Sequence, residues 1–269
     1  GNKLHAPPVK EFAVSEGLTV HQPAKIKTQE TLNLFKSHEA EIAVVVAYGR
    51  ILPQTLLETP AKGCVNVHFS LLPKYRGAAP VNWAIVNGET ETGVTTMKMD
   101  IGLDTGDMLL QRAADITPTE TAPELMEKLS HLGAELLSES LRDFDKLTAK
   151  PQNHEAATHA PIMKRDDGLI DWNMNATEIS NRVRGFQPFP NAFTTYESKK
   201  LVIWNAQTVA NLTSLVETGT ILQTKNGELL ISCGNHTTLS VTEVQLEGKK
   251  RMKVRDFLNG TKLNVGEKF

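Results

Sequence analysis

The feature that most constrains the fold is a series of short apolar runs in the first half of the chain, each followed by turn-forming residues. Ile42–Ala47 is an unbroken apolar run, and Gly49 and Pro53 follow it. A run of this length suits a strand that is buried on both faces of a parallel sheet. Cys64–Phe69 predicts a second strand, and Gly93–Met99 a third with partial alternation of apolar and polar residues. We therefore expect several strands of one buried sheet.

Helical patterns separate these runs. Thr28–Lys36 and Pro80–Asn87 have helical spacing, and Met108–Ile116 continues as a further strand. A long amphipathic helix follows, with Thr121 available as its N-cap and apolar residues every three to five positions: Leu125, Leu129, Leu132, Leu136, Leu141 and Phe144. Strands that alternate with helices predict a doubly wound, Rossmann-like α/β domain over residues 1–149.

The pattern changes after Ala149. Residues 150–167 have no sustained period, which predicts a linker. Ala176–Gly185 looks helical and is stopped by Pro188. Short β runs separated by Gly, Asn and Ser then follow, and Asn226-Gly227 is a typical hairpin turn between two of them; the runs are 192–196, 201–204, 219–222, 229–232 and 238–244. We expect residues 168–269 to form a small, OB-like β-barrel.

Composition and charge narrow the functional class. With 40% hydrophobic and 22% charged residues, the chain has the composition of a globular domain. Cys64 and Cys233 form no CxxC pair, which indicates a reducing, cytoplasmic setting. The net charge is −2, but residues 160–269 carry 14 Lys and Arg against 11 Asp and Glu. Lys249–Arg255 is a dense basic run, for which a solvated face is the simplest interpretation from charge alone.

Three polar residues stand at the ends of apolar runs, beside turns. Asn66 and His68 are two positions apart at the end of one predicted strand, so their side chains should project to the same side. Asp104 lies in a loop between Gly102 and Gly106, which permit close backbone approach. Each of the three alone would be an ordinary structural residue. Together, an amide, an imidazole and a carboxylate could polarise a carbonyl group and move a proton.

Other chemistries lack support in the sequence. There is no GxGxxG or Walker pattern, so dinucleotide and P-loop sites are not predicted. His154 and His159 have no partners at metal-ligand spacing. Asp100 superficially begins a calcium loop, but the twelfth position is Gln111 rather than an acid. We expect no metal.

Longer motifs around these residues carry a family resemblance. Asn66–Pro73, Lys74–Pro80 and Gly102–Asp107 together resemble the folate-dependent formyltransferases, and among them the branch that acts on methionyl-tRNA. Val44–Pro53 is similar to that family's folate-pocket region, and Gly168–Trp172 to the start of its second domain. The resemblance covers essentially the whole chain.

The resemblance implies a reaction and a set of residue roles. The chain would transfer the formyl group of 10-formyltetrahydrofolate to the α-amine of methionyl initiator tRNA. The Asn66 amide and a protonated His68 would stabilise the oxyanion, while Asp104 orients His68, raises its pKa and relays the proton of the amine. The substrate-binding residues would be Tyr48, Gly49, Ile51, Leu52, Ser70, Leu71, Leu72, Pro73 and Gly102. The tRNA-binding residues would be Lys3, Arg76, Lys249, Lys250, Arg251 and Lys253.

The same resemblance implies the setting. We expect a monomer without membrane contact, in a bacterial cytosol or an organelle matrix. Two departures stand out. The family pattern begins about 40 residues before Gly1, so the first strand, helix and second strand are expected to be missing. Phe69 stands where the family often has a small residue, and its side chain should face away from Asn66 and His68.

Alternative functions remain open at this point. A formyltransferase that acts on an amino-sugar nucleotide would use the same motifs, and a folate-dependent hydrolase is a more distant possibility. From another class, the chain could be an RNA-binding module with an inactive α/β half. The basic run favours tRNA over the first two. The intact set of Asn66, His68 and Asp104 argues against the last.

Overall fold

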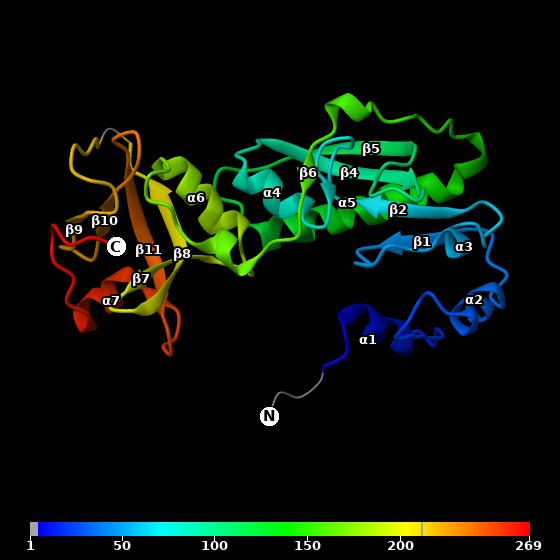
Figure 1. Cartoon of the computed structure of the whole chain (residues 1–269), viewed down its shortest axis with the longest axis horizontal. Helices are drawn as coiled ribbons and strands as arrows, with labels where there is room; N and C mark the ends of the chain where they lie inside the picture. The colour runs from blue at the N-terminus through cyan, green and yellow to red at the C-terminus, as the bar shows by residue number, and fades with distance from the viewer. Residues whose placement is uncertain (1–4, 211) are drawn as a thin grey trace.

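The computed structural model describes residues 5–210 and 212–269, which form two units along the long axis of the molecule (Figure 1). The first unit is built on a sheet with the order β1-β2-β4-β5. Its strands are β1 Ala43–Val46, β2 Cys64–His68, β4 Glu91–Lys98 and β5 Met108–Asp115. The strands β1 and β2 are parallel, and the two later strands run antiparallel to their neighbours. The α/β, Rossmann-like prediction is confirmed, with a mixed rather than wholly parallel sheet.

The strand predicted at Ile42–Ala47 forms as β1, but it is not buried on both faces. Val44 and Val46 are 42% and 47% exposed. The expectation of two buried faces was wrong because β1 is an edge of the described sheet and pairs there with β2 alone. Two short helices precede β1 in the chain, α1 Pro8–Ser15 and α2 Gln29–Lys36, and a third, α3 Gln54–Leu57, follows it. Thr28 caps α2 by accepting a hydrogen bond from the Thr31 N–H.

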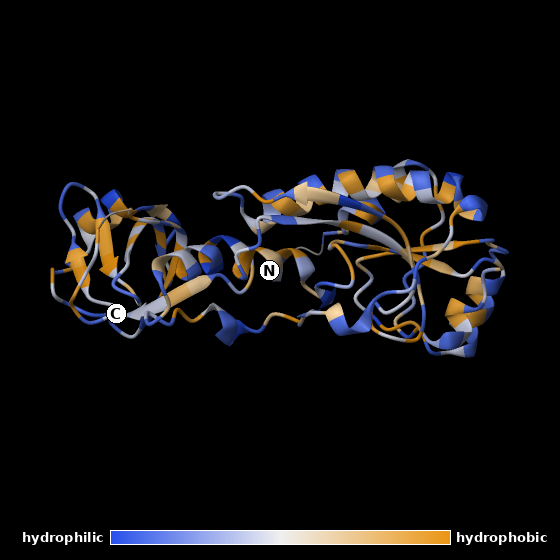
Figure 2. Ribbon diagram, turned by 90° about the horizontal axis from the view of Figure 1, so that it is seen from above, coloured by the Kyte–Doolittle hydropathy of each residue, from blue (hydrophilic) through white to orange (hydrophobic). Residues whose placement is uncertain are grey.

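The long helix α5, Ala122–Arg142, packs against the sheet. Thr121 and Glu124 form the capping box that begins it. Its apolar face buries Leu125, Leu129 and Leu136 in one core, and Figure 2 shows apolar and polar residues alternating along the helix. Two further elements precede α5: β3 Arg76–Gly77 and α4 Pro80–Val86.

The packing of α5 decides which side of β2 the polar residues face. A Cβ atom at Gly133 of α5 would lie 3.1 Å from both Val67 and Phe69. Val67 and Phe69 therefore face α5, as expected for Phe69. Since side chains alternate along a strand, Asn66 and His68 face the opposite side of the sheet.

The segment predicted as a linker is partly attached to the first unit. The strand β6, His159–Ala160, pairs in parallel with β3. Two short 3₁₀ turns, His154–Ala156 and Arg165–Gly168, flank it.

The second unit is a curled antiparallel sheet with the order β7-β8-β11-β10-β9, in which β12 also pairs with β11. These strands are β7 Ala192–Tyr196, β8 Lys199–Thr208, β9 Ile221–Gln223, β10 Leu229–Ser232, β11 Thr238–Leu246 and β12 Met252–Lys253; the helices α6 Ala176–Gly185 and α7 Val254–Gly260 pack on them. Asn226 and Gly227 both have positive φ, 60° and 73°, as a type I′ hairpin turn requires. The barrel-like expectation is confirmed as a half-barrel.

The helices α4 and α6 join the two units. Asn82 of α4 donates a hydrogen bond of 2.8 Å to the carbonyl oxygen of Gly185 at the end of α6. A Cβ atom at Gly185 would lie 2.7 Å from Val86 Cγ2, so the helices approach closely only because this residue is glycine. Arg184 extends the junction by donating to the carbonyl oxygens of Thr117 and Glu120.

Candidate active site

The buried imidazole of His68 is the centre of the candidate site. His68 is 5% exposed at the end of β2. Its Nε2 lies 2.9 Å from the carbonyl oxygen of Tyr75, and its Nδ1 lies 3.7 Å from Oδ2 of Asp104. The second distance is within ion-pair range but too long for a direct hydrogen bond. The structure thus brings His68 and Asp104 together, as the sequence predicts.

The surroundings of His68 act on its pKa in opposite directions. Burial lowers the pKa of His68, and the charge of Asp104 and the hydrogen bond to the Tyr75 carbonyl raise it, with burial the larger effect. Asp104 therefore acts in the predicted direction, and a protonated His68 stays a prediction. A carbonyl oxygen can only accept, so Nε2 carries the hydrogen of the neutral ring and Nδ1 keeps a lone pair.

Asp104 is held by its loop. Its φ is +53°, in the left-handed region, and its Oδ2 accepts a hydrogen bond of 2.8 Å from the Gly77 N–H. The Asp100 carboxylate ties the loop from inside by accepting from the Gly102 N–H and the Thr105 hydroxyl. A Cβ atom at Gly106 would lie 1.9 Å from the Lys98 carbonyl oxygen, so only glycine fits there. The carboxylate is thus fixed beside His68.

Asn66 shares the face of His68. It is 9% exposed, and its side-chain amide makes no hydrogen bond to any described residue. Among the described residues, no side-chain atom of Asn66 is both fully buried and without a hydrogen-bond partner. The unpaired amide therefore reaches the surface of the site. An amide N–H that is free to donate, at the rim of a buried imidazole, suits the oxygen of a reacting carbonyl group.

The predicted substrate-binding residues divide into two groups. Ser70 is fully buried and its hydroxyl donates to the Lys74 carbonyl oxygen, while Leu72 is 3% exposed. These two were predicted as substrate contacts; they lie inside the core and support the turn that presents the Tyr75 carbonyl to His68. The residues that remain open to solvent or partly so are Tyr48, Gly49, Ile51, Leu52, Leu71, Pro73 and Gly102.

The predicted tRNA-binding residues also divide. Lys3 lies outside the described residues. Arg76, predicted to bind tRNA, is 5% exposed and donates two hydrogen bonds to Gln152. Lys249, Lys250, Arg251 and Lys253 are exposed, and the last two pair with Glu243. The guanidinium of Arg251 also lies 4.8 Å from the centre of the Trp204 ring.

Sequence reasoning missed three residues of the site. Tyr75 contributes a backbone carbonyl, Gly77 a backbone N–H, and Gln152 a side-chain amide. Backbone groups leave no signal in a single sequence. Gln152 stands in a segment without periodicity, and this segment is attached over the site by the bridge between Lys150 and Met108 and by the pairing of β3 with β6.

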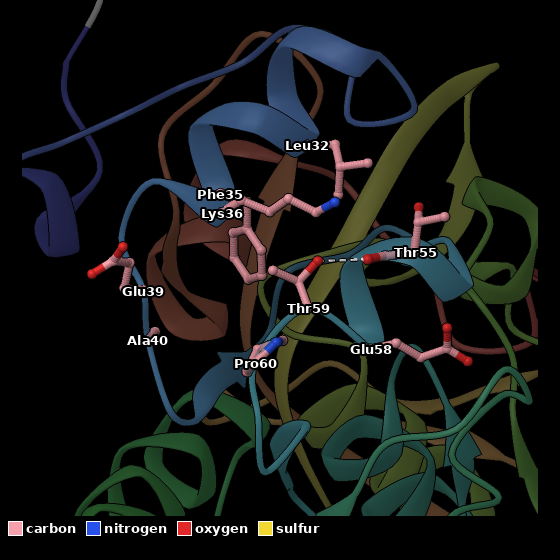
Figure 3. Close-up of a pocket in the computed structure, with 9 residues that line it drawn as sticks. All are labelled: Leu32, Phe35, Lys36, Glu39, Ala40, Thr55, Glu58, Thr59 and Pro60. Carbon is pink, nitrogen blue, oxygen red and sulfur yellow. Dashed lines mark hydrogen bonds between the residues drawn. The ribbon is translucent and has the colours of Figure 1, made fainter.

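A separate cavity of about 480 Å³ lies between α2 and α3 (Figure 3). Its lining includes Phe35, Lys36 and Glu58, and Thr59 donates a hydrogen bond to the Thr55 carbonyl oxygen at its edge. None of Asn66, His68 and Asp104 lines it. Within the described residues, no cluster of His, Cys, Asp and Glu could hold a metal ion, and no helix is long and apolar enough to cross a membrane.

Comparison with known proteins agrees with this geometry. Residues 2–141 match the family described as "Formyl transferase", and residues 162–262 match "Formyl transferase, C-terminal domain". The chain is 46% identical over 268 residues to a methionyl-tRNA formyltransferase from Alkaliphilus oremlandii, with 99% of this chain and 86% of the relative covered. It is 49% identical over 271 residues to the one from Koribacter versatilis, with 100% and 86% covered.

A solved structure shares the fold. WlaRD, a sugar 3N-formyl transferase in the presence of dTDP and 5-N-formyl-THF, superposes with a TM-score of 0.67 at 17% identity. The match covers 90% of this chain and 82% of that one. At this identity the likeness concerns the fold alone, and it does not favour a sugar substrate.

Proposed function

The chain belongs to the methionyl-tRNA formyltransferases, and from this premise we propose that Asn66, His68 and Asp104 transfer a formyl group from 10-formyltetrahydrofolate to the α-amine of methionyl initiator tRNA. Membership of this family supports a folate-derived formyl donor. The observation that carries the proposal is the buried imidazole beside a fixed carboxylate, with an available amide on the same strand face.

The proposed chemistry begins with the amine. An α-amine has a pKa near 8, so a useful fraction is neutral at about pH 7. Its nitrogen attacks the formyl carbon, and the carbonyl oxygen takes up negative charge. The Asn66 amide donates to that oxygen, and a donor of this kind stabilises the transition state by about 3 kcal/mol.

The proton of the attacking amine then needs an acceptor. Nδ1 of neutral His68 has a lone pair, and Asp104 stabilises the imidazolium that forms. In that state both ring nitrogens have partners, since Nε2 donates to the Tyr75 carbonyl and Nδ1 faces the carboxylate. When the bond between the formyl carbon and the folate nitrogen breaks, the imidazolium returns the proton to the leaving nitrogen. His68 ends the cycle neutral.

Exposed apolar side chains near the site can cover the face of a flat ring whose polar edge binds to backbone groups. Tyr48 and Ile51, after β1, are 46% and 70% exposed, and Ile101 and Leu103, in the Asp104 loop, are 72% and 56% exposed. Apolar side chains with nearby backbone polar groups are typical of cofactor and small-molecule sites. We assign the pterin ring to this surface.

The half-barrel supplies the proposed contact with tRNA. Lys249 and Lys250 follow β11 and are exposed, and neither forms an ion pair with a described residue. Positive side chains of this kind bind phosphates and release counterions. We propose a catalytic domain at residues 1–149, a connecting segment at 150–167 and a tRNA-binding domain at 168–269, in a cytosolic or organelle-matrix monomer.

The direct test is transfer of labelled formyl from 10-formyltetrahydrofolate to methionyl initiator tRNA. His68→Ala should lower the rate at least about 100-fold, while His131→Ala, an exposed histidine on α5, should leave it unchanged. An amino-sugar nucleotide serves as the competing acceptor. Formylation of the sugar alone would contradict the tRNA assignment, and equal rates for the two histidine variants would contradict the site.

A further inference from the structure

Two buried polar side chains outside the proposed catalytic set form a connected network beneath the Asp104 loop. Nε and Nη2 of Arg76 donate to Oε1 of Gln152 at 3.0 and 2.7 Å. Nε2 of Gln152 in turn donates to the carbonyl oxygens of Asp104 and Gly106 at 2.9 and 2.7 Å. Arg76 and Gln152 are each 5% exposed. All hydrogen-bonding groups of the Gln152 amide are therefore committed.

Arg76 determines which way the Gln152 amide points. A guanidinium has only donors, so it can be satisfied by Oε1 and not by Nε2. With Oε1 directed at Arg76, both hydrogens of Nε2 are directed at the loop. Because the two accepting carbonyls lie on either side of Thr105, this single amide group clamps the loop immediately after the carboxylate-bearing residue.

The same short strand holds the carboxylate itself. Gly77 follows Arg76 in β3, and its N–H donates to Oδ2 of Asp104. The strand is fixed in register by β6, where Arg76 pairs with His159 and Gly77 with Ala160. The side chain of Asp104 is thus held by Gly77, and its backbone carbonyl is held by Gln152, which Arg76 of the same strand orients. This double attachment keeps Asp104 at φ +53°, a conformation that a non-glycine residue seldom adopts.

Burial of the guanidinium is otherwise unexplained. Among the described residues Arg76 has no carboxylate partner, and its remaining contact is Nη2 to His154 Nδ1 at 3.2 Å. A charge removed from water is costly unless it is well hydrogen-bonded. A structural role alone would be met equally well by apolar side chains, whereas control of the amide orientation requires a donor-only group.

We propose that Arg76 and Gln152 are positioning residues that aim the Asp104 carboxylate at His68. This inference rests on the proposed roles of His68 and Asp104. In this proposal neither Arg76 nor Gln152 contacts the substrate. Their contribution is to the rate of the chemical step rather than to the binding of either substrate.

Gln152→Met tests this proposal because it keeps the length of the side chain and adds no charge. We expect kcat to fall about 10- to 100-fold, the effect of a small misplacement in an active site. The KM values for folate and tRNA should stay close to those of the unchanged protein. The acid limb of the kcat profile should move to lower pH, since a displaced Asp104 supports the imidazolium less. Gln29→Met, an exposed substitution of the same kind on α2, should change none of these.

A second variant guards against misfolding. Gln152→Glu still accepts from Arg76 but has lost both N–H donors, so it should fold, as circular dichroism checks, and show the same loss of kcat. Titration of His68 by ¹⁵N NMR of histidine-labelled protein provides a readout without substrate: Gln152→Met should lower its midpoint.

Three outcomes would overturn the inference: a kcat near that of the unchanged protein in folded variants, a loss confined to KM, or an unmoved His68 titration. Failure of the unchanged protein to formylate tRNA would instead refute the proposed function. The NMR titration would still report on the positioning of Asp104.

Discussion

Nε2 of His68 lies 2.9 Å from the carbonyl oxygen of Tyr75, a contact that fixes which ring nitrogen carries the hydrogen of the neutral imidazole. Nδ1 is left with its lone pair on the side of Asp104. The direction in which His68 can accept a proton is therefore set by a backbone group of a neighbouring turn. Three predictions concern this site, and two concern the attachment and the charge of the half-barrel.

Asp104→Asn should move the acid limb of the pH profile of kcat to lower pH and should lower the plateau of that profile. The charge of Asp104 raises the pKa of His68, while burial depresses it below its ordinary 6.5. Without the carboxylate the pKa of His68 falls further, so the neutral, active imidazole persists to lower pH. The plateau should drop about 100-fold because the imidazolium has lost its partner. Asp115→Asn, at an exposed carboxylate at the end of β5, is the control, and movement of the limb to higher pH would refute the assignment.

His68→Gln should reduce the acid sensitivity of folding. The pKa of His68 is lower in the folded protein than in the unfolded chain, so the unfolded chain binds more protons below about pH 6.5. The contribution of neutral His68 to the free energy of unfolding is complete above that pH and is lost as the pH falls toward the folded pKa. Urea unfolding between about pH 7 and 5 should show a smaller loss in His68→Gln than in the unchanged protein. His131→Gln should behave like the unchanged protein.

Gly77→Ala should damage stability and activity together. Its φ is +120°, and a Cβ atom there would lie 2.6 Å from the Ala160 carbonyl oxygen. Separation of β3 from β6 would also withdraw the N–H that holds Asp104. We expect a loss of about 3 kcal/mol in the free energy of unfolding. In Gly248→Ala, at φ +77° with open space around it, the cost should be about 1 kcal/mol, without loss of kcat.

Gly185→Ala should weaken the use of tRNA more than the use of folate. The added Cβ would lie 2.7 Å from Val86 Cγ2 and 3.1 Å from the Asn82 carbonyl oxygen, so α4 and α6 must move apart. A changed angle between the units displaces Lys249 and Lys250 relative to His68, and the KM for tRNA should rise several-fold at an unchanged KM for folate. Overpacking should also cost about 1–3 kcal/mol of stability. Gly260→Ala, with open space, is the control, and equal effects on both KM values would contradict this interpretation.

Lys250→Ala should lower tRNA affinity and reduce its salt dependence. Each phosphate contact that is lost reduces the slope of log K against log salt by about 1. Arg251 and Lys253 are already partly neutralised by Glu243, whose pKa is lowered by hydrogen bonds from both. Lys253→Ala should therefore have the smaller effect. Filter binding at several salt concentrations measures both slopes, and equal slopes for the two variants would argue against a phosphate contact at Lys250.

The sequence alone predicted the main strands of both sheets, the helices α2, α4, α5 and α6, and the division between an α/β half and a β half, and it singled out Asn66, His68 and Asp104 as candidates. Periodicity and turn residues are local properties, so β2, the capped helix α5 and the Asn226-Gly227 hairpin could be predicted from neighbouring residues. The trio followed from residue types and motif spacing that a family shares.

Only the tertiary structure decided what surrounds those residues. Burial depresses the pKa of His68, and Arg76, which was predicted to bind tRNA, lies in the interior. Both results depend on packing between distant segments. The bridge between Lys150 and Met108, together with the pairing of β3 with β6, brings Gln152 under a loop nearly fifty positions earlier in the chain. Backbone groups such as the Tyr75 carbonyl and the Gly77 N–H are present in every residue, so their role depends on where the fold places them and not on which side chain they carry.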